Sequence, residues 1–455
     1  MLLRDDKSEG CAFPGELKNK AFQQYFGHFL RAGSSHELLS SKVKLAGLTA
    51  KRKPSMRLLH SVLPMVPKTN KSQRTFVAHL ISLLLLLPGH ATFRNFSRYS
   101  SYHEKTFARQ FAKPFDFVAL NKAAIVTVVP ADHEQALALD ASFIAKSGKQ
   151  TYGLDRFWNS CHGRAERGLE ISVLGWVDIT HNSAYCLSVE QTPPSRAADP
   201  ESTRIDIYLE QLRRVVTQYH LQPLQYVLTD GAFSKVKFID GVCDLKLHHI
   251  GKLRCDANLR YLYTGPHRPG PGRPKTYDGK VRWSDLSRFE RAETSDEGII
   301  LYSQVVNHVQ FKRNLRVVKV VDTYSNRSAL LFSTDVDLAA TTIYRYYKAR
   351  FQIEFLFRDA KQFTGLSDCQ ARSQAKLQFH FAASLTAVTL AKLEARQQRD
   401  EPTASFSMAS FKRRSFNEHL IERILSTLAD GTTLDKCSPA YEQLCNYGAI
   451  THMAA

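Results

Sequence analysis

Apolar residues recur at intervals of three and four over several long segments, which is the spacing of amphipathic or buried helices. This spacing predicts helices within residues 71–117, interrupted at Pro88-Gly89, and at 202–219, 340–361, 374–396 and 415–429. The run LISLLLLL at 80–87 has eight residues and stops at Pro88. A transmembrane helix needs about 20 apolar residues, so we expect this run to be a buried core helix.

Other segments are rich in β-branched and aromatic residues and are bounded by turn residues, which predicts strands at 136–144, 171–180, 183–192 and 224–231. Three strands, the helix at 202–219 and a fourth strand ending in Asp230 form the order of an RNase H-like fold. Strand-like runs continue from 251 to 335, around a basic, turn-rich loop at 265–280. We therefore expect a β-rich insertion before the helix at 340–361.

A polar stripe crosses that otherwise apolar helix. It consists of Tyr347, Arg350, Glu354 and Lys361, whose spacings of three, four and seven place them within roughly 60° of one another on a helix. Arg358 falls on the same stripe. One interpretation is a solvated ion-pair face, because Arg–Glu pairs at i, i+4 are common on helices. The other is a functional site, because a carboxylate among apolar residues needs a partner.

Two further carboxylates favour the second interpretation. Asp140 follows the apolar run ALAL and Asp230 follows YVLT, so we expect both at strand ends. Either residue alone is compatible with an ordinary turn. Two aspartates and Glu354 together are the oxygen ligands that two hard divalent cations require, and such a metal pair catalyses in-line phosphoryl displacement.

The charge pattern points to a polyanionic partner. The chain carries a net charge of +19, and residues 1–125 contain 20 Lys and Arg against 7 Asp and Glu. Within 91–113, two short helices are expected around Ser100-Ser101. Lys105, Arg109 and Lys113 recur every four residues in the second, with Phe107 and Phe111 on another face. This layout is typical of the recognition helix of a helix-turn-helix motif, although an ordinary amphipathic surface helix has it too.

The eight cysteines form no C-x2-C pair or cluster. This spacing gives no support for a zinc finger or a disulfide framework, and we expect reduced thiols.

The stripe reads Tyr347-x2-Arg350-x3-Glu354-x6-Lys361, and in this it resembles the signature of the bacterial insertion-sequence DDE transposases. The segment LALDASFIAKSGKQTYGLDRFW around Asp140 and the segment TDGAFSK around Asp230 also resemble blocks of that family. The resemblance covers roughly residues 70–395.

The resemblance implies that Asp140, Asp230 and Glu354 are the catalytic triad and bind two Mg²⁺ ions, with Mn²⁺ as a substitute. Tyr347, Arg350 and Lys361 would contact phosphates of the transposon end. Its implied partners are double-stranded DNA, as transposon end and as target, and a second copy in a homodimeric synaptic complex. The resemblance also implies that no membrane is involved and that the protein acts in the bacterial cytoplasm, at the nucleoid. In relatives an extruded base stacks on an aromatic residue of the insertion; Trp283 is a candidate, and a core tryptophan is the alternative.

The expected fold class is therefore α/β: an RNase H-like catalytic core interrupted by a β-rich insertion, with a helical N-terminal DNA-binding domain. The expected domains are a basic arm that is flexible or precedes the true start (1–64), a helix-turn-helix-like domain (65–130), the first part of the core (131–250), the insertion (251–338), the second part of the core (339–398) and a helical tail (399–455). Two alternative functions remain: an inactive or domesticated DNA-binding protein, and an RNase H-like nuclease without strand transfer.

Overall fold

The structure is a computed structural model that describes residues 56–194, 203–221, 224–266, 273–398, 406–429, 439–445 and 447. The chain divides into two units, residues 1–54 and 55–455, and every described residue belongs to the second. Most of the expected arm and part of the expected loop at 265–280 lie outside the described residues.

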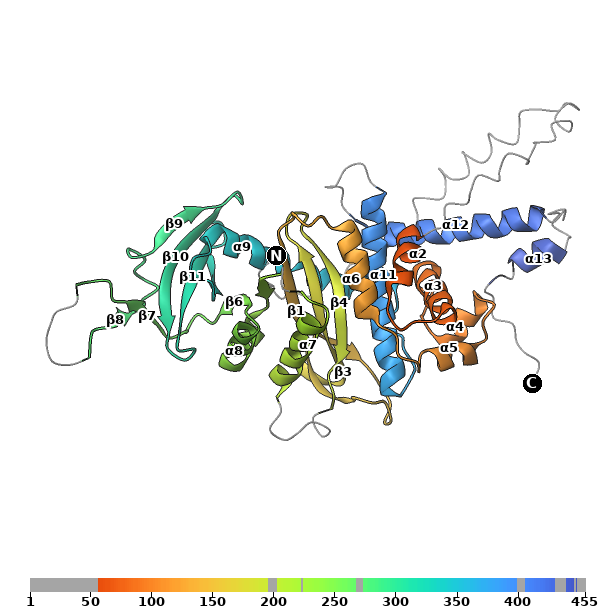
Figure 1. Ribbon diagram of the computed structural model, residues 1–455, viewed down its shortest axis with the longest axis horizontal. Coiled ribbons are helices and arrows are strands. Elements are labelled where there is room, and N and C mark those ends of the chain that lie inside the picture. The colour runs from red at the N-terminus through yellow and green to blue at the C-terminus, as the bar shows by residue number, and fades with distance from the viewer. Residues whose placement is uncertain are drawn as a thin grey trace, which may run out of the picture. The chain divides into compact units, whose positions relative to one another are not determined.

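The described chain begins with a group of helices (Figure 1). They are α2 (Arg57–Val62), the 3-10 turn η2 (Leu63–Met65), α3 (Lys71–Leu86), α4 (Phe93–Arg98), α5 (Glu104–Gln110) and α6 (Phe117–Val128). Helix α3 begins at a capping box in which Asn70 and Gln73 satisfy each other's backbone N–H groups. Its apolar run is buried, so the predicted core helix is confirmed. No described helix is long and apolar enough to cross a membrane.

Helix α2 corrects one expectation, because it lies inside the segment assigned to an arm. Leu58, Leu59 and Val62 are buried in the main hydrophobic core, and Met56 already belongs to that core. A helix of six residues is too short to show a period in the sequence.

The described strands form one twelve-stranded sheet in a mixed α/β fold. Its first half contains β1 (Gln135–Ala145), β2 (Asp155–Asn159), β3 (Arg164–Asp178), β4 (Ser183–Gln191), β5 (Tyr226–Leu228) and β6 (His248–Leu253). The order is β4-β3-β1-β5-β6, in which β1 is antiparallel to β3 and parallel to β5, and β5 is parallel to β6. Strand β2 was not expected; it pairs with the outer end of β3.

The expected insertion continues this same sheet. Its strands are β7 (Leu259–Leu262), β8 (Tyr277–Lys280), β9 (Glu290–Glu293), β10 (Ile299–His308), β11 (Arg313–Asp322) and β12 (Arg327–Ser333). Strand β12 pairs with β6, which joins the two halves through backbone hydrogen bonds. A second hydrophobic cluster, which includes Val306, Val317 and Phe332, lies beneath the added strands.

Helices cover both faces of the first half. The remaining helical elements are α7 (Arg204–Gln218), the 3-10 turn η3 (Gly231–Phe233), α8 (Val236–Asp244), α9 (Ala340–Arg350), α10 (Gln352–Phe363), α11 (Gln374–Gln397), α12 (Met408–Ala429) and α13 (Pro439–Cys445). Helices α6 and α11 pack against β4, and α7 lies on the other side of the sheet (Figure 1). Strand β3 is therefore buried from Gly168 to Asp178 without alternation.

The helix predicted at 340–361 is divided into α9 and α10. Phe351, between them, donates its N–H to the Lys348 carbonyl at 3.2 Å, and Glu354 donates to the Phe351 carbonyl at 3.1 Å. Both bonds span three residues instead of four, which tightens the turn at the junction. The break still leaves Arg350 and Glu354 one turn apart.

Candidate active site

Asp140 lies in the middle of β1, opposite Val173 of β3, and not at a strand end as expected. The apolar run stops there because β1 is buried up to Leu139 and partly exposed from Asp140 on. The strand itself continues, since β3 pairs with β1 as far as Ala145. Burial raises the pKa of Asp140 to about 7; the neighbouring Asp230 and Glu354 add to the rise, and Arg350 opposes it.

Asp230 follows β5, as expected, and its carboxylate caps η3 by accepting the Ala232 N–H at 2.9 Å. In the parallel pair of β1 and β5, Ala138 is in register with Leu228. Asp140 and Asp230 are each two residues beyond these partners. The two residues are therefore at the same level along neighbouring chain segments. Neighbouring strands lie about 4.8 Å apart, so the two carboxylates are close to each other.

Arg350 connects the helix pair to this strand. Its Nη2 donates to Glu354 Oε1 at 3.0 Å, and its Nη1 donates to Asp140 Oδ2 at 3.4 Å. Only 9% of the Arg350 side chain is exposed, and its Nε has no hydrogen-bond partner among the described residues. The Tyr347 ring lies beside it, with the guanidinium carbon 5.6 Å from the ring centre. Burial raises the pKa of Tyr347, and Asp230 and Glu354 act in the same direction.

Lys361 reaches β1 further along the strand. Its Nζ donates to Ser142 Oγ and to the Phe143 carbonyl, both at 2.9 Å. Arg350 and Lys361 therefore both contact the second half of β1, and Glu354 is linked to it through Arg350. Arg358 does not join them: its guanidinium binds Asp359 and lies over the Phe355 ring.

The basic residues of the expected recognition helix lie on α5 and just after it, outside the elements that hold the three carboxylates. Lys105 and Arg109 are exposed on α5, whereas Phe107 and Phe111 are buried, as the pattern predicted. Lys113 is exposed but lies beyond α5, which ends at Gln110. No contact links these cations to the three carboxylates in the described part of the chain.

A family model described as "DDE superfamily endonuclease" matches residues 61–298, just over half of the chain. The chain belongs to the DDE superfamily endonucleases. It is therefore a nuclease-type enzyme. The matched segment includes Asp140 and Asp230 and ends before α9 and α10. No curated protein matches the chain significantly. Among solved structures, the cryo-EM structure of a piggyBac transposase synaptic complex with hairpin DNA is similar to this chain, with a TM-score of 0.42 and 10% identity over 88% of this chain and 85% of the other.

DDE superfamily endonucleases typically use divalent metal ions, and the carboxylates of this chain fit such ions in two respects. Asp140, Asp230 and Glu354 offer hard oxygen ligands, as Mg²⁺ and Mn²⁺ prefer. Burial is the main cause of the raised pKa of Asp140, so a bound cation would stabilise the ionised form of this poorly solvated carboxylate.

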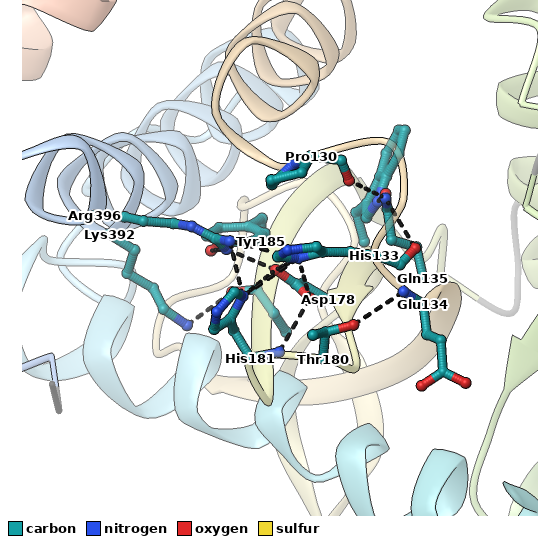
Figure 2. A network of polar contacts seen from close by, with 12 residues as sticks. Pro130, His133, Glu134, Gln135, Asp178, Thr180, His181, Tyr185, Lys392 and Arg396 are labelled. Atoms are coloured by element: carbon teal, nitrogen blue, oxygen red, sulfur yellow. Dashed lines mark hydrogen bonds and ion pairs between the residues drawn. The ribbon is translucent and has the colours of Figure 1, made fainter. Parts of the chain in front are cut away.

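Another group in the endonuclease was not anticipated from the sequence. Among the described residues, only His133, Asp178 and His181 bring three ligand atoms within 4.8 Å of one another. Figure 2 shows that Arg396 of α11 points into this group; it donates to Asp178 Oδ2 at 2.6 Å and to His181 Nδ1 at 2.8 Å. A guanidinium is always charged, so Arg396 already supplies a positive charge to this group.

The His133 group thus connects α11 to the segment before β1 and to the β3–β4 turn. Its members are far apart in the sequence and follow no recognised ligand spacing, so no sequence pattern marks them. Trp283, the candidate for base stacking, is partly buried and packs against Phe289, with ring centres 5.7 Å apart.

Proposed function

We propose that this endonuclease is a DNA transposase of an insertion sequence, which binds the inverted-repeat ends, cleaves them and joins the 3′ ends to target DNA. The observation that carries the proposal is that Arg350 binds both Asp140 and Glu354, while Asp230 lies near enough to Asp140 to raise its pKa. The strand order β4-β3-β1-β5-β6 supports an RNase H-like core, because two parallel strands follow three antiparallel ones.

Asp140, Asp230 and Glu354 would hold two Mg²⁺ or Mn²⁺ ions. When bound, such a pair activates the attacking oxygen and stabilises the leaving oxygen of an in-line phosphoryl displacement. Arg350 keeps Glu354 directed toward β1, because it binds both Glu354 and Asp140. Removal of this guanidinium would leave two neighbouring carboxylates without their shared partner.

Tyr347, Arg350 and Lys361 form the DNA-facing part of the proposed site. An ammonium group has three N–H donors, and Lys361 uses two of them on β1, which leaves one for a phosphate oxygen. Because these contacts hold the amine beside β1, a phosphate bound there lies next to the carboxylates.

The end DNA would also be bound elsewhere, by the helices that precede β1. Lys105 and Arg109 on α5, with Lys113 after it, present charge to solvent while the aromatic residues pack inward. We propose that they contact the phosphates of double-stranded DNA. Joining two ends requires that two copies meet, and we propose a homodimer in the synaptic complex.

The test compares Glu354→Gln with the parent protein on a plasmid that carries the terminal repeats. The amide keeps the shape of the side chain but removes the charge, so we expect cleavage in the presence of Mg²⁺ to fall at least 100-fold, because charge-stabilising groups typically contribute this much. Glu134→Gln is a matched control: this carboxylate also pairs with an arginine of α9, Arg345, but lies before β1. Full cleavage by Glu354→Gln would overturn the proposal.

The alternatives give different outcomes in the same experiment. An inactive DNA-binding protein would shift end DNA in a gel but would not cut it, whether or not a divalent metal is added. A nuclease without strand transfer would cut, but would not join pre-cleaved ends to a target plasmid.

A further inference from the structure

The strand that the sequence did not predict carries a tryptophan in an unusual place. Trp158 of β2 is 60% exposed, whereas Trp176 is 8% exposed. Tryptophan is highly buried on average, but a single exposed apolar side chain does not by itself indicate a partner, so the residues around the ring decide whether it marks a binding site.

The two-stranded ribbon of β2 and the outer end of β3 has two faces of different character. In the register of this pair, Arg156 lies opposite Arg167, and Trp158 lies opposite Ala165. Residues directly opposite in an antiparallel pair point to the same side, so these four share one face. All four are exposed.

The other face is already satisfied within the protein. Phe157 is buried beneath the guanidinium of Arg204, 4.9 Å from the ring centre. The Glu166 carboxylate accepts hydrogen bonds from Asn159, His162 and Arg164. The carboxylates of the ribbon therefore belong to this inner face, and the outer face has none.

The outer-face arginines keep donors for a ligand. Arg156 donates to the Ala165 carbonyl at 3.1 Å, which holds it along the ribbon and leaves its other N–H groups unused. Neither Arg156 nor Arg167 pairs with a carboxylate in the ranges that the structure describes. An exposed indole next to a pair of arginines on one face matches a nucleic acid strand, since bases stack on the ring and phosphates bind the guanidinium groups.

The ribbon also lies next to the proposed site. Gly168 of β3 pairs with both Ala145, the last residue of β1, and Asp155, the first of β2. The Lys361 amine binds the Phe143 carbonyl, only two residues before Ala145, so it lies near the start of the ribbon. DNA that passes Asp140 and Lys361 therefore reaches the ribbon next.

We propose that the outer face of the β2–β3 ribbon binds an unpaired stretch of DNA beside the cleavage site, with Trp158 stacked on one base and Arg156 and Arg167 on the flanking phosphates. Within a duplex both faces of each base are covered by its neighbours, so only a frayed or unpaired base is available to the ring. This inference rests on the proposed function, and it adds that the DNA beside the cleavage site is unpaired.

The test measures binding without divalent metal, by fluorescence anisotropy, for a labelled duplex and for the same duplex with four unpaired bases at one end. We expect Trp158→Ala to weaken binding of the forked probe by about 5- to 150-fold, the range found for the loss of one stacked base, and to leave the duplex unchanged. Trp158→Phe should restore part of the affinity. The forked probe should also quench tryptophan fluorescence in the parent protein and much less in Trp158→Ala.

Tyr324→Ala is the matched control, because Tyr324 is 73% exposed on the β11–β12 turn but binds Glu297, an acidic neighbour. It should bind both probes as the parent protein does. Equal binding of the forked probe by Trp158→Ala and the parent, or equal weakening for both probes, would overturn the inference. Because no metal is present, this outcome is independent of the cleavage test with Glu354→Gln, which alone decides the proposed function.

Discussion

Arg350 donates hydrogen bonds to Glu354, one turn along the helix pair, and to Asp140 on a distant strand. The first contact follows from the spacing of four residues and could be predicted from the sequence. The second depends on how α9 packs against the sheet, which no local pattern encodes. The same limit applies to Asp140 itself: the end of its apolar run was visible, but the continuation of the strand depends on pairing with β3.

His249 illustrates a buried residue whose charge state is fixed by its surroundings. Its ring is fully buried, lies near Phe238 and Phe332, and has its Nε2 2.7 Å from Thr229 Oγ1. Burial lowers the pKa of His249 to about 3. In the unfolded chain a histidine has a pKa of about 6.5, so between these values the unfolded state binds more protons. The contribution of His249 to stability is therefore complete above pH 6.5 and is lost as the pH falls.

We expect the free energy of unfolding, measured with urea, to fall by roughly 2 kcal/mol between pH 7 and pH 5 because of this residue, at about 1.4 kcal/mol per pH unit below 6.5. In His249→Gln, which does not titrate, the loss should be smaller by this amount. His220→Gln provides the control, because His220 is exposed. If His249→Gln showed the same pH dependence as the parent protein, the assignment of this effect to His249 would be wrong.

At the scale of elements, the order of strands and helices was largely visible in the sequence, whereas their partners were not. The strands at 136–144, 171–180, 183–192 and 224–231 and the helix at 374–396 are all present. The pairing of β6 with β12 could not be derived, because β-sheet partners far apart in the chain share no periodicity. The division at Phe351 was also hidden, since the apolar pattern continues through it.

Helix α2 depends on another element for its first turn. Met56, at its N-cap, supplies no side-chain acceptor. Glu394 of α11 does so instead: its carboxylate oxygens accept the N–H groups of Arg57 at 3.2 Å and Leu58 at 2.9 Å. Glu394 is 2% exposed. The sequence could not indicate this cap, because the two elements are more than 300 residues apart.

We expect Glu394→Ala to lower the free energy of unfolding by about 1–3 kcal/mol, the usual cost of leaving buried donors without acceptors. Glu394→Gln keeps one oxygen and should cost less. Urea denaturation measures both, and hydrogen exchange of the Arg57 and Leu58 amides should accelerate in Glu394→Ala. Glu422→Ala, at an exposed position of α12, should change neither quantity. Unchanged exchange in Glu394→Ala would show that water caps α2 equally well.

At the scale of the whole molecule, the positive charge is concentrated before the sheet. Of the net charge of +19, residues 1–125 contribute 20 basic against 7 acidic side chains, and residues 38–103 contain no Asp or Glu. Folding leaves Lys105 and Arg109 exposed on α5. A surface of this kind attracts DNA through the release of condensed counterions, so its binding weakens linearly on a plot of log affinity against log salt concentration.

If Lys105 and Arg109 each neutralise one phosphate, Lys105→Ala with Arg109→Ala should lower the affinity for end DNA and reduce the slope of that plot by about two, since each phosphate contact contributes about one. Fluorescence anisotropy at several salt concentrations measures both values. Lys280→Ala with Lys312→Ala removes the same charge from exposed positions at the end of β8 and in the β10–β11 turn, and serves as the control. A loss of slope shared by both double variants would mean that net charge alone attracts the DNA. A loss confined to the α5 variant would mean that DNA lies along α5, because only a charge next to a phosphate displaces its counterion.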